Sequence, residues 1–200
     1  MAVDFANTVT GAGVATVDLL SRTDSAQQWW TQQAQAQVLP PGTAPDFQAS
    51  GKLRTALRQL FEAAIAGRSW PQRALSTINT FAANAPVSEA IAGGRVVLTP
   101  NESELARTLD LAQGTMAERR WHAQRPGQAM LAAIAEDAIR LLADEPRRMR
   151  LRRCANPGCS IIFLAKHPRR VWCSGSTCGN RRRVARHDRS ARTAATKEQS

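Results

Sequence analysis

The chain has 200 residues, of which 43% are hydrophobic, and it carries 27 Lys and Arg against 16 Asp and Glu, a formal net charge of +11. This length allows one sizeable domain and a small second module, and ordinary contents of 12 Gly and 10 Pro exclude a fibrous repeat and wholesale disorder. No apolar stretch approaches the roughly 20 residues of a membrane span, and Asp4 stands where a secretory signal would be apolar, so we expect a cytoplasmic protein without membrane contact.

Three helices are predicted before residue 86. The first has Asp24 or Ser25 as its N-cap and ends before Pro40. The second has one apolar stripe, at Leu53, Leu57, Leu60, Phe61 and Ala64, and Gly67 is placed to end it. The third has Pro71 in its first turn and buries Leu75, Ile78, Phe81 and Ala82. We expect core packing for the apolar side chains; a ligand pocket is the alternative for Trp29, Trp30, Trp70 and Trp121.

The hydrophobic period changes after residue 86. Gly93-Gly94 predicts a hairpin turn whose second strand spans residues 95–98. Asn101 and Glu104 form a capping-box pattern in front of an apolar stripe at Leu105, Leu109 and Ala112. The clearest late helix carries Met130, Ile134, Ala138, Leu141 and Leu142. This region contains no phosphate-binding glycine loop, metal-binding His-Glu helix or nucleophile elbow.

Charge is distributed unevenly along the chain. Residues 1–146 carry 12 Lys and Arg against 14 Asp and Glu, whereas residues 147–200 carry 15 Lys and Arg against only Asp188 and Glu198. A near-neutral body is therefore joined to a strongly basic C-terminal module, and this asymmetry favours a polyanionic partner.

All four cysteines lie in the basic module, within 25 residues, in the spacing C-x4-C-x13-C-x4-C. In a reducing cytosol such a cluster indicates metal ligands, although two disulfides are an alternative. Two close pairs can present four sulfurs to the corners of a tetrahedron, which is the coordination of structural zinc. We predict one structural Zn²⁺ ion bound by Cys154, Cys159, Cys173 and Cys178, with His167 as an alternative ligand.

The residues around these cysteines predict a treble-clef zinc finger. Residues 161–163 and 170–172 are the expected strands of a hairpin that bends at Lys166-His167-Pro168, and the side chains of Phe163 and Trp172 are expected to cover the sulfurs. A helix is expected from Cys178 onward, with Val184 facing the hairpin. Because so small a module buries little apolar surface, the metal would supply much of its folding free energy.

Basic side chains surround the predicted site. A helix that begins near Cys178 would gather several arginines on one face, suited to phosphate contacts. The residues expected to contact nucleic acid are Lys166, Arg169, Arg170, Arg182, Arg183, Arg186 and Arg189. A solvated charged helix without a partner is the alternative. Four residues close to the ligands are expected to support the site, the arginines by offsetting its net negative charge: Arg152, Arg153, Asn180 and Arg181.

Two stretches of sequence resemble known families. Cys178-Gly179-Asn180-Arg181, preceded by Arg-Val-Trp-Cys-Ser at 170–174 and Arg-Arg-Cys at 152–154, resembles the CGNR-type zinc finger. The run Asp4-Phe5-Ala6-Asn7-Thr8 is similar to the start of the ABATE domain, which precedes that finger in stress-induced transcription regulators of bacteria. The resemblance implies a mainly α fold with a small β component: a helical ABATE-like domain over residues 1–146 and a zinc-binding treble-clef finger over residues 147–192. The small polar residues 193–200 are expected to be a frayed tail.

The basic zinc module predicts nucleic-acid binding, and the family resemblance implies a transcription regulator whose finger binds double-stranded DNA and whose N-terminal domain senses a small-molecule effector or a stress signal. A single finger reads few bases, so we also expect a homodimer. RNA binding by the same basic face and docking of an acidic protein partner are alternatives. A nuclease using His167, Asn180 and His187 is a third, but only Asp188 lies near them to bind a second metal, so we expect no enzyme activity.

Overall fold

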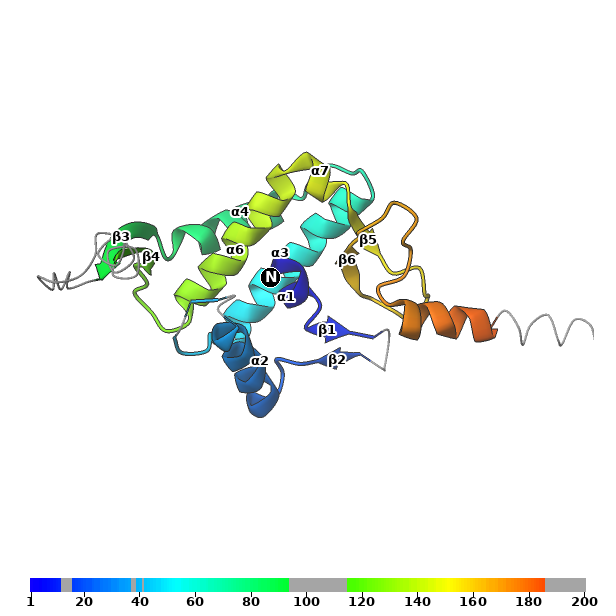
Figure 1. Cartoon of the computed structure of the whole chain (residues 1–200), viewed down its shortest axis with the longest axis horizontal. Helices are drawn as coiled ribbons and strands as arrows, with labels where there is room; N and C mark the ends of the chain where they lie inside the picture. Colours follow the sequence, from blue (N-terminus) through cyan, green and yellow to red (C-terminus); the bar gives the residue numbers. More distant parts are fainter. Residues whose placement is uncertain (12–15, 37–38, 41, 94–114, 186–200) are drawn as a thin grey trace, which may run out of the picture.

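The computed structural model describes residues 1–11, 16–36, 39–40, 42–93 and 115–185, and helices predominate in this part of the chain (Figure 1). The α-helices are α1 (Ala2–Ala6), α2 (Thr23–Gln35), α3 (Phe47–Ile65), α4 (Gln72–Ala83), α6 (Gln128–Ala143) and α7 (Glu145–Arg148). The antiparallel strand pairs are β1 (Val9–Thr10) with β2 (Val17–Asp18), β3 (Val87–Gly93) with β4 (Thr115–Trp121), and β5 (Leu151–Arg153) with β6 (Ile162–Leu164). The predicted fold, mainly α with a small β component, is confirmed. No helix of the described residues is long and apolar enough to cross a membrane.

Helices α3 and α6 form where the apolar stripes predicted them. Asp46 caps α3, its Oδ1 accepting a 2.9 Å hydrogen bond from the Ala49 N–H. In α3 the fully buried stripe residues are Leu53, Leu57, Leu60 and Phe61, and in α6 the five predicted core residues are all buried. Gly127, directly before α6, has φ +76°, and a Cβ there would lie 2.4 Å from Pro45 Cα. Both the conformation and the close approach require glycine at this position.

The start of α2 differs from the prediction, while that of α4 is shifted by one position. Arg22 occupies the N-cap position of α2 and makes no side-chain capping bond, so Asp24 and Ser25 lie in the first turn. The predicted cap is wrong because the Ser25 hydroxyl donates to the Leu19 carbonyl at 2.6 Å instead of facing the helix amides. Pro71 is the N-cap of α4 and directly precedes its first residue.

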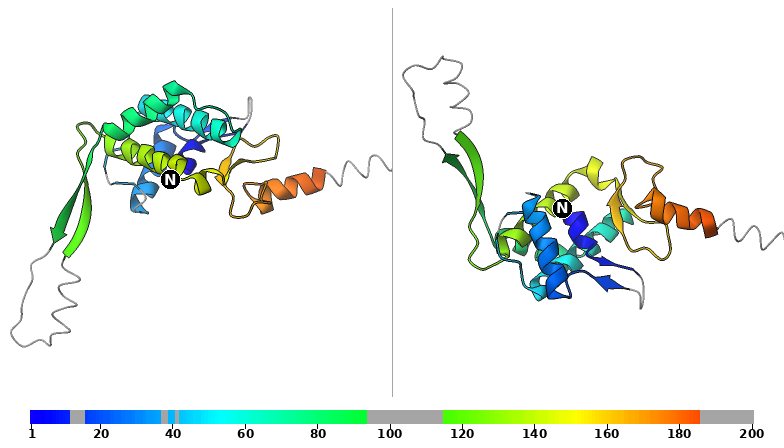
Figure 2. Two further views of the ribbon diagram at one scale, coloured as in Figure 1. Left: turned by 90° about the horizontal axis from the view of Figure 1, so that it is seen from above. Right: turned by 60° about the horizontal axis from the view of Figure 1, so that its bottom comes forward.

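Strands β3 and β4 form a ribbon that projects from the helical body (Figure 2). Their register runs from Val87 opposite Trp121 to Gly93 opposite Thr115. The strand that pairs with β3 in the described part of the chain is thus β4, which the sequence did not predict. The predicted strand over residues 95–98 and the helix expected after Asn101 lie outside the described residues.

One hydrophobic core contains residues of the helices and of the β5–β6 pair. The strand pair lies beside the helical body (Figures 1 and 2). The Phe5 ring of α1 packs against both neighbouring indoles, with centroid distances of 5.7 Å to Trp29 and 5.6 Å to Trp30. Leu151 of β5 and Ile162 of β6 are 1% and 0% exposed and belong to this same core. The first strands of the cysteine-bearing segment are therefore packed onto the helical domain.

A partly buried ion pair joins the N-terminal strands to α3. Arg54 Nη1 and Nη2 lie 2.8 and 2.6 Å from the two carboxylate oxygens of Asp18, and Nη1 also donates to Thr8 Oγ1 at 3.0 Å. Only 8% of the Arg54 side chain is exposed. Burial raises the pKa of the Asp18 carboxyl, but hydrogen bonds from Arg54 and from the Leu20 N–H outweigh burial, so the pKa lies below its ordinary value.

Candidate metal centre

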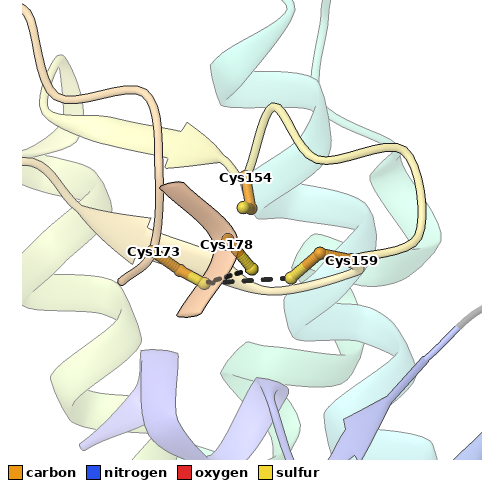
Figure 3. A group of neighbouring side chains, drawn as sticks. All are labelled: Cys154, Cys159, Cys173 and Cys178. Atoms are coloured by element: carbon orange, nitrogen blue, oxygen red, sulfur yellow. Dashed lines mark hydrogen bonds between the residues drawn. The ribbon is translucent and has the colours of Figure 1, made fainter. Parts of the chain in front are cut away.

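The first cysteine pair lies in the loop between β5 and β6. Cys154 directly follows β5, and its N–H donates to the Ile161 carbonyl at 2.9 Å, which closes the base of the loop. At the other end of the loop, the Cys159 N–H donates to the Asn156 carbonyl at 2.9 Å in a tight turn. This loop returns the chain on itself and brings both sulfurs to one side (Figure 3).

The second pair lies at a short helical turn directly before the final described helix. The chain forms one π-helical turn over Gly175–Gly179 and continues as an α-helix over residues 180–185. The Ser174 hydroxyl caps this turn by accepting from the Thr177 N–H at 3.2 Å. Cys173 lies just before the turn and Cys178 within it, so both sulfurs face the first loop (Figure 3).

The four sulfurs converge on one point. The Sγ atom of Cys173 lies 3.8 Å from Cys159 Sγ and 3.6 Å from Cys178 Sγ. All four Sγ atoms lie within 4.8 Å of one another. Tetrahedral zinc with Zn–S bonds near 2.3 Å places its sulfurs about 3.8 Å apart. A disulfide would need about 2.0 Å, and all four cysteines are free. The donor set and its spacing fit one structural Zn²⁺ ion, and His167 is not part of the group.

The surroundings shift the pKa values of the cysteine thiols in different directions. Burial and the neighbouring Cys178 thiol raise the pKa of Cys173. For Cys154 burial also raises the pKa, but backbone hydrogen bonds from Cys173 and Asn156 outweigh it and lower the pKa. Because zinc binds cysteine as the thiolate, metal binding at these cysteines is coupled to proton release and weakens as the pH falls.

Apolar side chains shield the sulfurs, as predicted. Phe163 and Ala165 are buried with Cys154 and Cys178 in one small cluster, and the Trp172 indole packs against it. A Cβ on Gly179 would lie 3.3 Å from Trp172 Cδ1, so glycine lets the turn approach the indole closely.

The predicted hairpin between residues 161–163 and 170–172 is wrong. Strand β6 pairs with β5, and residues 170–172 form no strand. A turn does occur at the predicted bend, where the Arg170 N–H donates to the His167 carbonyl at 3.0 Å. This turn leads into an irregular segment that reaches Cys173.

Hydrogen bonds explain why no strand pairs with the edge of β6 that faces away from β5. The Asn7 side chain occupies its outer edge, with Nδ2 donating to the Ile162 carbonyl at 2.7 Å and Oδ1 accepting from the Ile162 N–H at 3.0 Å. The irregular segment is held elsewhere, because the Val171 carbonyl accepts from the Ala155 N–H at 2.9 Å. In the sequence, Asn7 stands out only as part of the family-like run Asp4-Phe5-Ala6-Asn7-Thr8, and nothing there indicates this structural role.

The basic residues nominated from the sequence divide into two groups. The first group is exposed to solvent and consists of Lys166, Arg169, Arg181 and Arg183. Asn180 is exposed at the start of the helix, and Arg182 is half-buried. Others contact the protein itself: Arg152 Nη1 donates to the carbonyls of Met149 and Leu151 at 2.7 and 2.8 Å, and Arg153 lies 3.8 Å from Glu62. Arg186 and Arg189 lie outside the described residues.

Arg170 and Val184 occupy positions that the sequence did not suggest. The Arg170 guanidinium donates to the carbonyls of Trp172 (3.0 Å) and Cys173, and its Cζ lies 4.9 Å from the Phe163 ring centroid. It therefore braces the second cysteine loop. Val184 was expected to face the hairpin, but 52% of it is exposed, because the short helix extends away from the finger's base (Figure 1).

Comparison with protein families agrees with this geometry. A family model named ABATE and described as "Putative stress-induced transcription regulator" matches residues 1–145, and a CGNR zinc finger model matches residues 150–191. No curated protein matches the chain. The first match spans more than half of the chain, and the second contains all four converging cysteines. The chain therefore belongs to the ABATE family and carries a CGNR zinc finger.

Proposed function

We propose that this protein is a transcription regulator that binds double-stranded DNA through the basic side chains of its zinc finger. The observation that carries the proposal is the exposure of Lys166, Arg169, Arg181 and Arg183 on a scaffold organised by one metal ion. Guanidinium and ammonium groups held apart on a rigid surface suit the spaced phosphates of nucleic acid. The family description names a regulator and no catalytic activity.

A titration of labelled duplex DNA with the zinc-loaded protein at several salt concentrations tests the proposal. If about six cationic side chains engage phosphates, log K falls against log salt with a slope near −5. Arg183→Gln is expected to weaken binding and to reduce the slope by about 1. The matched control is Arg22→Gln, an exposed arginine at the N-cap position of α2, outside the finger, and it should leave both quantities unchanged.

Two other outcomes would redirect the proposal. Tighter binding to RNA of equal length at the same salt would assign the basic surface to RNA. No binding to either nucleic acid at low salt would contradict the proposal and favour an acidic protein partner.

Signal reception by the helical domain and homodimer formation belong to the same proposal. A cavity of about 350 Å³ lies at the base of the β3–β4 ribbon, and Trp121, Pro126 and Met130 are among its lining residues. It is a candidate place for a small effector, since mostly apolar walls with few polar groups are typical of ligand pockets. A Trp121→Ala variant that senses an effector as well as the wild type would contradict that placement.

Light scattering that gives the mass of one chain on DNA would contradict the dimer.

A further inference from the structure

We propose that the zinc centre and the helical domain fold as one cooperative unit, and that Asn7 is the positioning residue that couples them. The proposal goes beyond the family match, which treats the helical domain and the finger as separate models. It also stands apart from the proposed function, because it requires no DNA.

The coupling begins at the outer edge of β6. In an antiparallel pair, alternate residues direct their N–H and C=O groups away from the partner strand. Ile162 is such a residue, and it is 0% exposed, so its outward polar groups have no access to water. The Asn7 carboxamide supplies one donor and one acceptor to these two groups, as a third strand would. Removing the carboxamide would leave a buried N–H and a buried C=O unpaired.

Asn7 is itself fixed by the helical domain. It follows α1 directly, and its backbone N–H donates to the carbonyls of Val3 and Asp4 at 3.2 and 3.1 Å. The preceding Phe5 and Ala6 are 0% exposed in the main core. The first helix thus holds the carboxamide in place before it meets β6.

A second link joins α3 to the far end of the first cysteine loop. Arg58 donates from Nη1 to the Ala6 carbonyl at 3.0 Å and from Nη2 to the Ser160 carbonyl at 3.1 Å. Ser160 directly follows the ligand Cys159. The ligand Cys154 likewise follows Arg153, whose guanidinium lies 3.8 Å from Glu62 of α3. Both ligands of the first pair are therefore flanked by residues that contact the helical domain, and the Arg58 hydrogen bonds are the stronger of the two links because the Arg153 side chain is 57% exposed.

Reciprocity gives this arrangement a measurable consequence. Where folding of the helical domain fixes two zinc ligands, zinc must in turn stabilise the helical domain by the same free energy. If the finger were an independent module, metal removal would unfold it alone and leave the helices unaffected.

Thermal unfolding of the full chain, followed by far-ultraviolet circular dichroism with zinc and after chelation, tests the proposal. The helical transition of the wild type is expected to fall by about 5–10 °C on chelation. Asn7→Ala is expected to shrink this zinc-dependent shift and to weaken zinc about tenfold in competition with a colorimetric chelator. Asn84→Ala, at the exposed C-cap of α4, is the matched control and should behave as the wild type.

The zinc-dependent shift separates coupling from simple destabilisation. A local role for Asn7 would lower the midpoint equally with and without zinc, leaving the shift and the zinc affinity at wild-type values, and this would overturn the proposal. A midpoint of the wild-type helical transition that does not change on chelation would overturn it as well. If Asn7→Ala does not fold, Arg58→Gln provides the same comparison through the Ser160 link, with the same expected and contradicting results.

Discussion

Arg170 provides a sharp test of how the finger is built, because the sequence nominated it for DNA contact while the structure turns it inward. Its guanidinium donates to two carbonyls of the second cysteine loop and lies over the Phe163 ring. Each charge-assisted hydrogen bond contributes roughly 1.5–3 kcal/mol net, and a partly exposed cation–π contact about 0.5–1 kcal/mol. Allowing for water that replaces part of this in the half-buried site, Arg170→Ala should lower the stability of the zinc-bound finger by about 2–4 kcal/mol.

Competition for zinc with a colorimetric chelator measures this effect, because folding of the finger and metal binding are linked. A loss of about 2 kcal/mol corresponds to a zinc dissociation constant raised roughly 30-fold. The control is Arg169→Ala, the exposed neighbour, which should leave zinc affinity unchanged and weaken only DNA binding. Equal zinc affinity in the two variants, with a larger DNA defect in Arg170→Ala, would refute the bracing role.

Two further predictions concern the helical domain. Gly127→Ala should lower the free energy of unfolding in urea by at least about 2 kcal/mol, because φ is +76° and the new Cβ would meet Pro45. Gly51→Ala, inside α3 with open space around it, should instead raise the free energy of unfolding by up to about 1 kcal/mol. Similar stabilities for the two variants would contradict this. Since Arg54 lowers the pKa of Asp18, the stabilising pair is fully present above the ordinary carboxyl pKa of 3.8 and is lost as the pH falls through the lower folded value. Asp18→Asn should therefore lower stability at neutral pH and flatten its decline below pH 3.8, as unfolding against pH would show, and an unchanged acid limb would contradict it.

Local sequence patterns predicted the parts of this fold that depend on short-range periodicity and ligand chemistry. The stripe through Leu53 and Leu57 identified α3, because one buried helix face needs apolar residues at that spacing. The four cysteines identified the metal site, because zinc requires donor types that few other roles bring together.

Pairings between distant residues were not predictable from the same patterns. Asn7 and Ile162 are separated by 155 positions, and nothing local marks an amide side chain that completes a strand edge. The hairpin predicted next to β6 was wrong for this reason, since that edge was already occupied. Arg170 likewise looked like a surface cation, because sequence alone does not reveal which carbonyls need a donor.

X-ray absorption at the zinc edge of the purified full chain tests the central claim most directly. The account predicts one zinc ion per chain with four sulfur neighbours at about 2.3 Å, from Cys154, Cys159, Cys173 and Cys178. Absence of zinc, or a first shell in which nitrogen or oxygen replaces one of the sulfurs, would contradict it.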